Sequence, residues 1–143
     1  MQRKNLILID SSRLKLLDLC GKGNYGYVFR GQLELDDDEN NLVAVKMIKD
    51  SSQNRFLLEE MITMKDFCHP NVMSLKFVTI VCPIQPSYTI PSLALVFPYM
   101  HYGDLHSYVR DESNSPRLCD LINYSTQIAS GFSFNSFFCF SNF

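Results

Sequence analysis

Apolar residues in the first hundred positions occur in short runs, and each run ends at glycine, proline or charged residues. Runs of this length predict strands at 13–20, 27–33, 42–48 and 93–97, and one or two more within 72–81. The first two strands are separated by a tight glycine-containing segment, which predicts a hairpin. We therefore expect an α+β fold built on a twisted, five-stranded antiparallel sheet.

A helical spacing replaces the strand pattern at 54–67, where apolar residues recur at intervals of three and four. This spacing predicts one amphipathic helix packed on the sheet. Ser51 or Ser52 is its expected cap, and Pro70 stops it because proline cannot continue a helix.

Two further helices are expected after residue 100, at 104–110 with Asp104 as the N-cap and at 118–131. The last segment differs in composition, because six of the twelve residues at 132–143 are Phe and none is charged. No helical period continues there, and the segment is too short and serine-rich to span a membrane. We expect this tail to be poorly ordered, and the apolar face of the 118–131 helix to promote association.

Composition and charge exclude some classes of function. The 143 residues carry a net charge of −2 without a Lys/Arg cluster, which argues against a nucleic-acid partner. Five cysteines without a close pair indicate free thiols in a reducing compartment, and no histidine clusters with them to form a metal site. The apolar run Leu6–Ile9 is too short for a signal peptide or a membrane span. We expect a cytoplasmic chain in which this run packs against the domain.

The segment with the most specific chemistry is the glycine turn that contains Gly21, Gly23 and Gly26. Glycines let backbone N–H groups approach phosphate oxygens without obstruction by side chains. In a dinucleotide-binding fold a helix follows the third glycine, whereas β-branched and aromatic residues follow Gly26 here. The turn therefore belongs to a hairpin. Lys46 stands on the next apolar strand, where its ammonium group can meet the same phosphates.

This order of strand, glycine turn, strand, lysine strand and helix resembles the small lobe of the protein kinases. Residues 56–72 (FLLEEMITMKDFCHPNV) are similar to the C-helix and its exit in receptor tyrosine kinases, and residues 98–106 (PYMHYGDLH) are similar to their hinge. The likeness covers roughly residues 6–131 and is greatest to the Axl/Mer/Tyro3 and Met/Ron receptors.

The resemblance implies an organisation of the whole chain. The expected fold is a kinase small lobe with its C-helix, the hinge and the first helices of the large lobe. The expected parts are a juxtamembrane-like segment at 1–12, the small lobe and hinge at 13–100, the start of the large lobe at 101–131 and a divergent tail at 132–143.

The resemblance also implies roles in binding ATP. Lys46 would bind the α- and β-phosphates, under a cover formed by the backbone of the glycine turn. Glu60 would pair with Lys46 and hold it in position. Glu59 is the rival for this role, and the distance from His69 favours Glu60.

The remaining implied contacts concern the adenine and the ribose. Cys20, Val28 and Ala44 would line the adenine pocket, with Phe97 at its back wall. The backbone of Pro98 and Met100 would hydrogen-bond the adenine edge, and Asp104 would reach the ribose.

Catalysis in the family also needs an aspartate base and the residues that hold Mg²⁺, from His-Arg-Asp and Asp-Phe-Gly motifs. Neither motif occurs in the 143 residues, so we expect this chain alone to be inactive. The alternative is a non-catalytic interaction protein that pairs with a full kinase as a decoy or modulator. The expected partners are ATP and, beyond it, a full-length kinase or a chaperone.

Overall fold

The computed structural model describes residues 8–23, 26–34, 42–48, 54–81 and 91–141, the last of these from residue 136 by backbone alone. The expected Ser51 or Ser52 cap and residues Leu6 and Ile7 lie outside the described residues. The chain divides into two compact units. One comprises Met1–Phe67 and Ser74–Tyr99, and the other Cys68–Met73 and Met100–Phe143.

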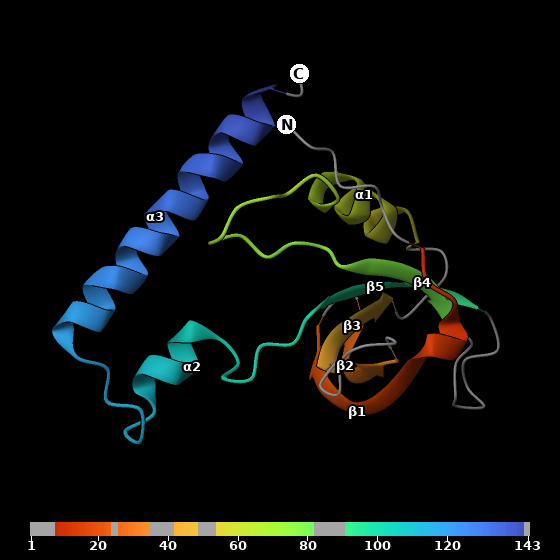
Figure 1. The fold of residues 1–143 in the computed structure, drawn as a ribbon, viewed down its shortest axis with the longest axis horizontal. Helices are drawn as coiled ribbons and strands as arrows, with labels where there is room; N and C mark the ends of the chain where they lie inside the picture. Colours follow the sequence, from red (N-terminus) through yellow and green to blue (C-terminus); the bar gives the residue numbers. More distant parts are fainter. Residues whose placement is uncertain (1–7, 24–25, 35–41, 49–53, 82–90, 142–143) are drawn as a thin grey trace. The chain divides into compact units, whose positions relative to one another are not determined.

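The first unit is built on a five-stranded sheet in which all neighbouring strands are antiparallel, as the sequence predicts (Figure 1). Its order is β1-β2-β3-β5-β4. The strands are β1 (Leu14–Lys22), β2 (Gly26–Leu33), β3 (Leu42–Ile48), β4 (Phe77–Val81) and β5 (Ser92–Pro98). Strand β4 occupies only the second half of the region expected at 72–81.

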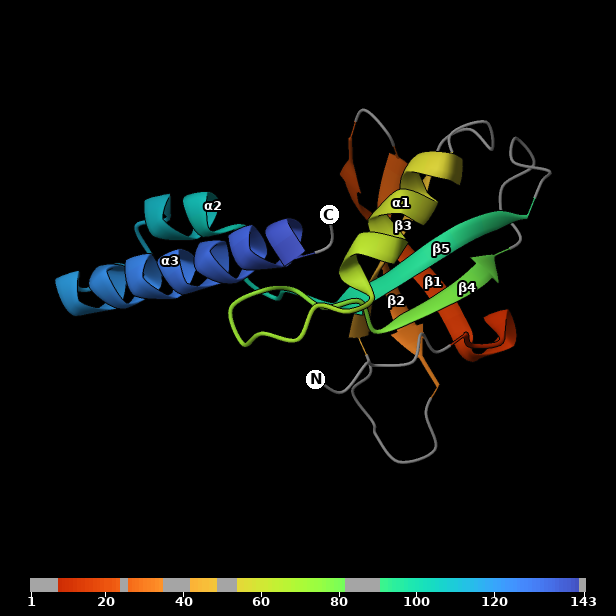
Figure 2. The same cartoon turned by 90° about the horizontal axis from the view of Figure 1, so that it is seen from above.

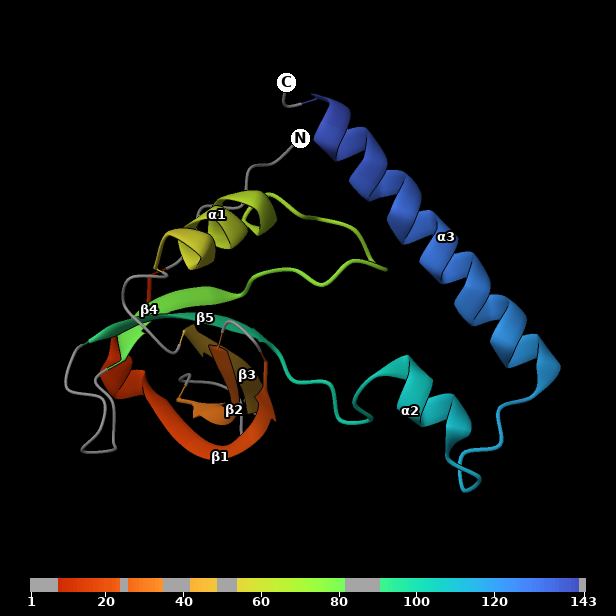
Figure 3. The same ribbon diagram turned by 180° about the vertical axis from the view of Figure 1, so that it is seen from behind.

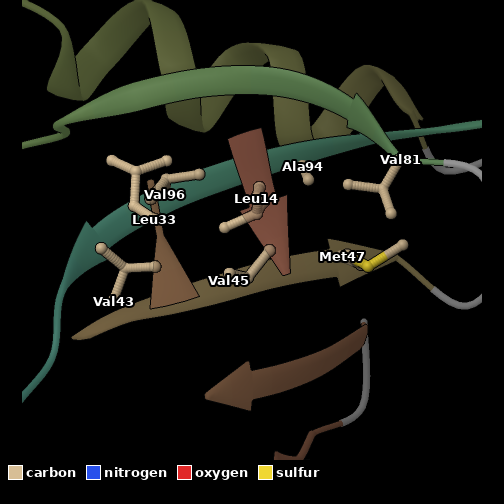
Figure 4. Close-up of a cluster of buried hydrophobic side chains, with 8 residues drawn as sticks. All are labelled: Leu14, Leu33, Val43, Val45, Met47, Val81, Ala94 and Val96. Carbon is tan, nitrogen blue, oxygen red and sulfur yellow. The ribbon is translucent and has the colours of Figure 1, made fainter. Parts of the chain in front are cut away.

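Strand β3 lies in the middle of the sheet and has buried residues on both faces. Val43, Val45 and Met47 belong to one cluster, and Ile48 belongs to a second one on the opposite face. Burial on both faces explains why this strand reads as a nearly unbroken apolar run. The first cluster contains Leu14, Leu33, Val43, Val45, Met47, Val81, Ala94 and Val96 (Figure 4).

Helix α1 (Asn54–Met64) covers the second face and lies over β3 and β5 (Figure 2). Leu57, which is 2% exposed, is the helix residue buried deepest in that cluster, and Met61 and Met64 pack around it. The helix was expected to reach Phe67, but it ends at Met64. The backbone N–H of Phe67 donates to Met64 O at 3.1 Å, so the chain turns before the proline is reached.

The segment before β1 runs beside the edge strand β4. Leu8 forms an isolated parallel bridge with Val78, and the Ile9 N–H donates to Val78 O at 3.0 Å. The buried Thr79 hydroxyl donates to Ile9 O at 2.9 Å. Ile9 packs against the first cluster, as expected for this run, whereas the side chain of Leu8 is 70% exposed.

The second unit contains α2 (Leu105–Arg110) and α3 (Leu118–Ser141), together with the segment 68–73. Asp104 caps α2 as predicted, because its side chain accepts a hydrogen bond from Ser107 N–H. In the described part of the chain, no helix is both long and apolar enough to cross a membrane.

The tail was expected to be poorly ordered, but the structure continues α3 from Leu118 to Ser141, while residues 142 and 143 lie outside the described residues (Figure 3). Serine hydroxyls do not interrupt it, since Ser133 donates to Ala129 O at 3.0 Å within the helix. Phe134 stacks on His69, with ring centroids 5.0 Å apart. Contact with a segment some sixty residues earlier in the chain therefore supports the helix beyond Gly131.

Candidate functional site

The glycine turn joins β1 to β2 in a hairpin, as the residues after Gly26 predict. The Gly23 N–H donates to Gly26 O at 3.0 Å and so closes the turn. Asn24 and Tyr25, at its tip, lie outside the described residues. Gly21 lies in β1, and Gly26 is the first residue of β2.

The three glycines of the turn have different surroundings. A Cβ added to Gly26 would collide with Met47 O and would lie only 3.1 Å from Met47 C. A Cβ at Gly23 would meet nothing within 4 Å, and one at Gly21 would make ordinary contact with Val28 at 3.8 Å. Gly26 is therefore required by the close approach of β2 to β3, a reason that the sequence motif does not reveal.

Lys46 and Glu60 form the ion pair predicted from the sequence. The Lys46 Nζ donates to both carboxylate oxygens of Glu60, at 2.7 and 2.6 Å. Their side chains are 34% and 31% exposed, so the pair remains partly accessible to solvent. The pair joins β3 to α1 and makes the position of the ammonium group depend on the helix.

The choice between Glu60 and Glu59 follows from the helical repeat. Glu60 stands three residues after the buried Leu57 and therefore shares the face of α1 that looks toward the sheet. Glu59 points to solvent instead and pairs with Arg55 at 2.8 Å, four residues earlier on the helix. The structure thus selects Glu60 as the partner of Lys46.

Four of the residues expected around adenine come from neighbouring strands of the first unit. Val28 is directly opposite Lys46, and Ala44 is directly opposite Phe97. Residues that face each other on neighbouring strands share a face of the sheet, and so do residues two positions apart on one strand. The side chains of Val28, Lys46, Ala44 and Phe97 therefore lie on one face. Phe97 is 4% exposed and belongs to the second cluster, beside Ala44. Cys20 is exposed on β1, next to Gly21, and its thiol is free.

The other expected contacts are divided between the two units. Pro98 ends β5 in the first unit, whereas Met100 and Asp104 belong to the second. Met100 O accepts a hydrogen bond from Gly103 N–H at 3.1 Å, in a turn where Gly103 has a φ of +70°. Such a positive φ favours glycine at this position.

Asp104 already has a structural task in the second unit. Its carboxylate accepts hydrogen bonds from the Ser107 N–H and hydroxyl, both at 2.8 Å. These two bonds hold the pKa of Asp104 below its ordinary value, the backbone N–H having the larger effect. The aspartate is thus kept ionised as a helix cap, whether or not it also meets a ligand.

Sequence reasoning missed an ion pair at the base of the glycine turn. Arg30 on β2 donates to Asp18 on β1 through Nε at 2.9 Å and through NH2 at 2.6 Å. The hydrogen bond to Asp18 is the main reason why the pKa of Arg30 is raised. Opposite charges on the two strands of a hairpin, roughly equidistant from its turn, were the signal that could have revealed it.

Comparison with known families agrees with this geometry. A family model described as "protein tyrosine and serine/threonine kinase" matches residues 14–136. The match covers most of the chain, so the chain belongs to this family. Its five-stranded sheet with α1 is the small lobe of a protein kinase. The match ends at residue 136, so it includes the first residues of the segment that was expected to be divergent.

Proposed function

We propose that this chain is part of a receptor-type protein tyrosine kinase domain and that its first unit binds ATP. The observation that carries the proposal is the Lys46–Glu60 pair on the same sheet face as Val28 and Ala44. This arrangement puts a held cation beside an apolar surface, with the glycine turn directly connected to the strand of Val28. A nucleotide needs these three features for its phosphates and its base.

Each element has a defined task in this proposal. Backbone N–H groups of the glycine turn cover the phosphates, and the Lys46 Nζ binds the α- and β-phosphates. Glu60 keeps that ammonium group in place. Because the Lys46 side chain is partly exposed, a phosphate can still reach it. Val28, Ala44 and Cys20 contact the adenine.

The hinge completes the proposed nucleotide contacts. Phe97 closes the back of the adenine pocket. The backbone of Pro98 pairs with the adenine edge, while the contacts that the family resemblance implies for Met100 and Asp104, which belong to the second unit, stay predictions.

We expect this chain, assayed by itself, to bind ATP without transferring its phosphoryl group. Phosphoryl transfer depends on Mg²⁺ and on a positioned aspartate base, and the motifs that supply them in kinases do not occur in these 143 residues. The assignment to the receptor-type tyrosine kinases rests on the resemblance of segments 56–72 and 98–106 to the C-helix and hinge of those kinases. The coding sequence around this chain tests that assignment, through a membrane-spanning segment upstream and a His-Arg-Asp motif downstream.

ATP binding is tested by isothermal titration calorimetry on the full chain. Replacing Lys46 by Met should weaken ATP binding about tenfold or more, because a charge-assisted contact to phosphate is lost. Lys15→Met is the matched control, since Lys15 is an exposed lysine on β1. Binding of ATP by the Lys46→Met protein with unchanged affinity would contradict the proposed site.

A second candidate function is an interaction protein that pairs with a full kinase. The observation in its favour is the exposure of several large apolar side chains on α3. These residues are Leu118 (73%), Leu121 (39%), Ile122 (59%), Ile128 (46%) and Phe132 (69%). A pull-down with a purified tyrosine kinase domain distinguishes the two functions. Capture by the wild-type chain but not by Ile122→Glu, without measurable ATP binding, would favour this alternative.

A further inference from the structure

The β1 strand is irregular where it approaches the glycine turn. Its pairing with β2 shifts register between Leu16 and Leu19 and again between Leu19 and Gly21. Such irregularities bend a strand and interrupt its ladder of hydrogen bonds, and β1 is visibly curved (Figure 1). Backbone pairing therefore defines the path into the turn less tightly than a regular ladder would.

The β2 strand is regular in its pairing with β3 on the other side. Val28 lies opposite Lys46, and Arg30 lies opposite Ala44, in an unbroken register. Arg30 is thus firmly placed relative to the strand that carries the proposed phosphate-binding lysine. A side chain of β1 that binds Arg30 therefore also fixes the position of β1 relative to Lys46.

Asp18 makes this connection. It lies in the first irregular stretch of β1, three residues before Gly21, and both Arg30 donors meet the same oxygen, Oδ1. Tyr99 and Cys20 also raise the pKa of Arg30, and both contribute less than Asp18 does. The guanidinium group therefore remains charged and directed at Asp18.

The outer end of the same hairpin has its own side-chain contact. Lys22 and Tyr27 are opposite each other, and the Lys22 Nζ lies 5.9 Å from the centre of the Tyr27 ring. This contact lies next to the turn, whereas the Asp18–Arg30 pair lies farther from it, within the irregular part of β1. The two contacts hold the hairpin at separate points along its length.

We propose that Asp18 and Arg30 are positioning residues, which hold the glycine turn at the height where its backbone meets the phosphates. The inference rests on the proposed ATP site and names no direct contact of either residue with the nucleotide. Loss of the pair lets the end of β1 shift relative to Lys46. The main consequence falls on the phosphates, because Val28 and Ala44 lie on the regularly paired strands β2 and β3, and of the proposed adenine contacts only Cys20 lies on β1.

The test compares ATP with adenosine, which lacks the phosphates, by calorimetry on the full chain. Asp18→Asn and Arg30→Gln should each weaken ATP binding about two- to fivefold, the range covered by exposed ion pairs, and weaken adenosine binding less. The exchanged protein Asp18→Arg/Arg30→Asp should recover most of the loss. Glu59→Gln is the matched control, since it removes an exposed ion pair from α1.

Three results would overturn the inference: unchanged ATP affinity in the single variants, an equal loss for adenosine, or no recovery in the exchanged protein. If wild-type chain does not bind ATP, the proposed function fails, and hydrogen exchange at the Gly23 amide decides the positioning role instead. Faster exchange in Asp18→Asn, restored by the Asp18/Arg30 exchange, supports it. Unchanged exchange overturns it.

Discussion

Replacing Glu60 by Gln removes one charge from the pair with Lys46 and nearly preserves the size and helix propensity of the side chain. Exposed ion pairs contribute about 0.2–1 kcal/mol, whereas removing one partner of a buried pair costs about 3–5 kcal/mol. With 34% of Lys46 and 31% of Glu60 exposed, this pair lies between these limits. We expect Glu60→Gln to lower the free energy of unfolding by about 1–2 kcal/mol.

The neighbouring Glu59 provides a control of the same residue type on the same helix. It pairs with Arg55, and the two side chains are 55% and 85% exposed. Glu59→Gln should therefore cost less than about 0.5 kcal/mol, as is usual for helical pairs four residues apart. The assay is equilibrium urea unfolding followed by far-UV circular dichroism, with the midpoint shifted and the slope unchanged.

A double-mutant cycle separates the pair from other effects of each substitution. The variants are Lys46→Met, Glu60→Gln and both together, and their coupling energy should be about 1 kcal/mol. Equal destabilisation by Glu60→Gln and Glu59→Gln, together with a coupling energy near zero, would refute the reasoning. The ion pair would then have no energetic role in joining α1 to β3.

Two further predictions concern the glycine turn and the cap of α2. Gly26→Ala should destabilise the chain by about 1–3 kcal/mol in urea unfolding, because its Cβ would overlap the Met47 backbone. Gly23→Ala should lower the free energy of unfolding much less, because the space around Gly23 is open. Equal losses in the two variants would contradict this prediction. Because hydrogen bonds from Ser107 lower the pKa of Asp104, its cap is fully formed above the ordinary value of 3.8 and is lost as pH falls through the lowered pKa. A nuclear magnetic resonance titration of the Ser107 amide should show a midpoint below 3.8, absent in Asp104→Asn, and a midpoint at or above 3.8 would disprove the assignment.

The local pattern of apolar residues in the sequence was sufficient to predict most elements of the small lobe. The strands and α1 could be predicted because a strand repeats every two residues and a helix every 3.6, and each buries one side. The Lys46–Glu60 pair could be predicted as well, from the family resemblance and the distance to His69. Asp104 as a cap followed from its residue type at the start of a helix.

Tertiary structure alone decided the features that depend on contacts between distant residues. The continuation of α3 past Gly131 has no periodic signal in the sequence, and only the structure shows it, together with the stacking of Phe134 on His69. Likewise, only the structure shows that α1 ends at Met64, since the helical spacing in the sequence continues to Phe67.

The glycine turn shows the same division between sequence and structure. The sequence by itself determined that a glycine-rich hairpin precedes a lysine strand, because residue types and spacing are local properties. Only the structure showed that Gly26 is needed where β2 approaches Met47 and that Arg30 holds Asp18 across an irregular stretch. Both depend on strand register, which arises from the packing of whole strands and is not encoded at any single position.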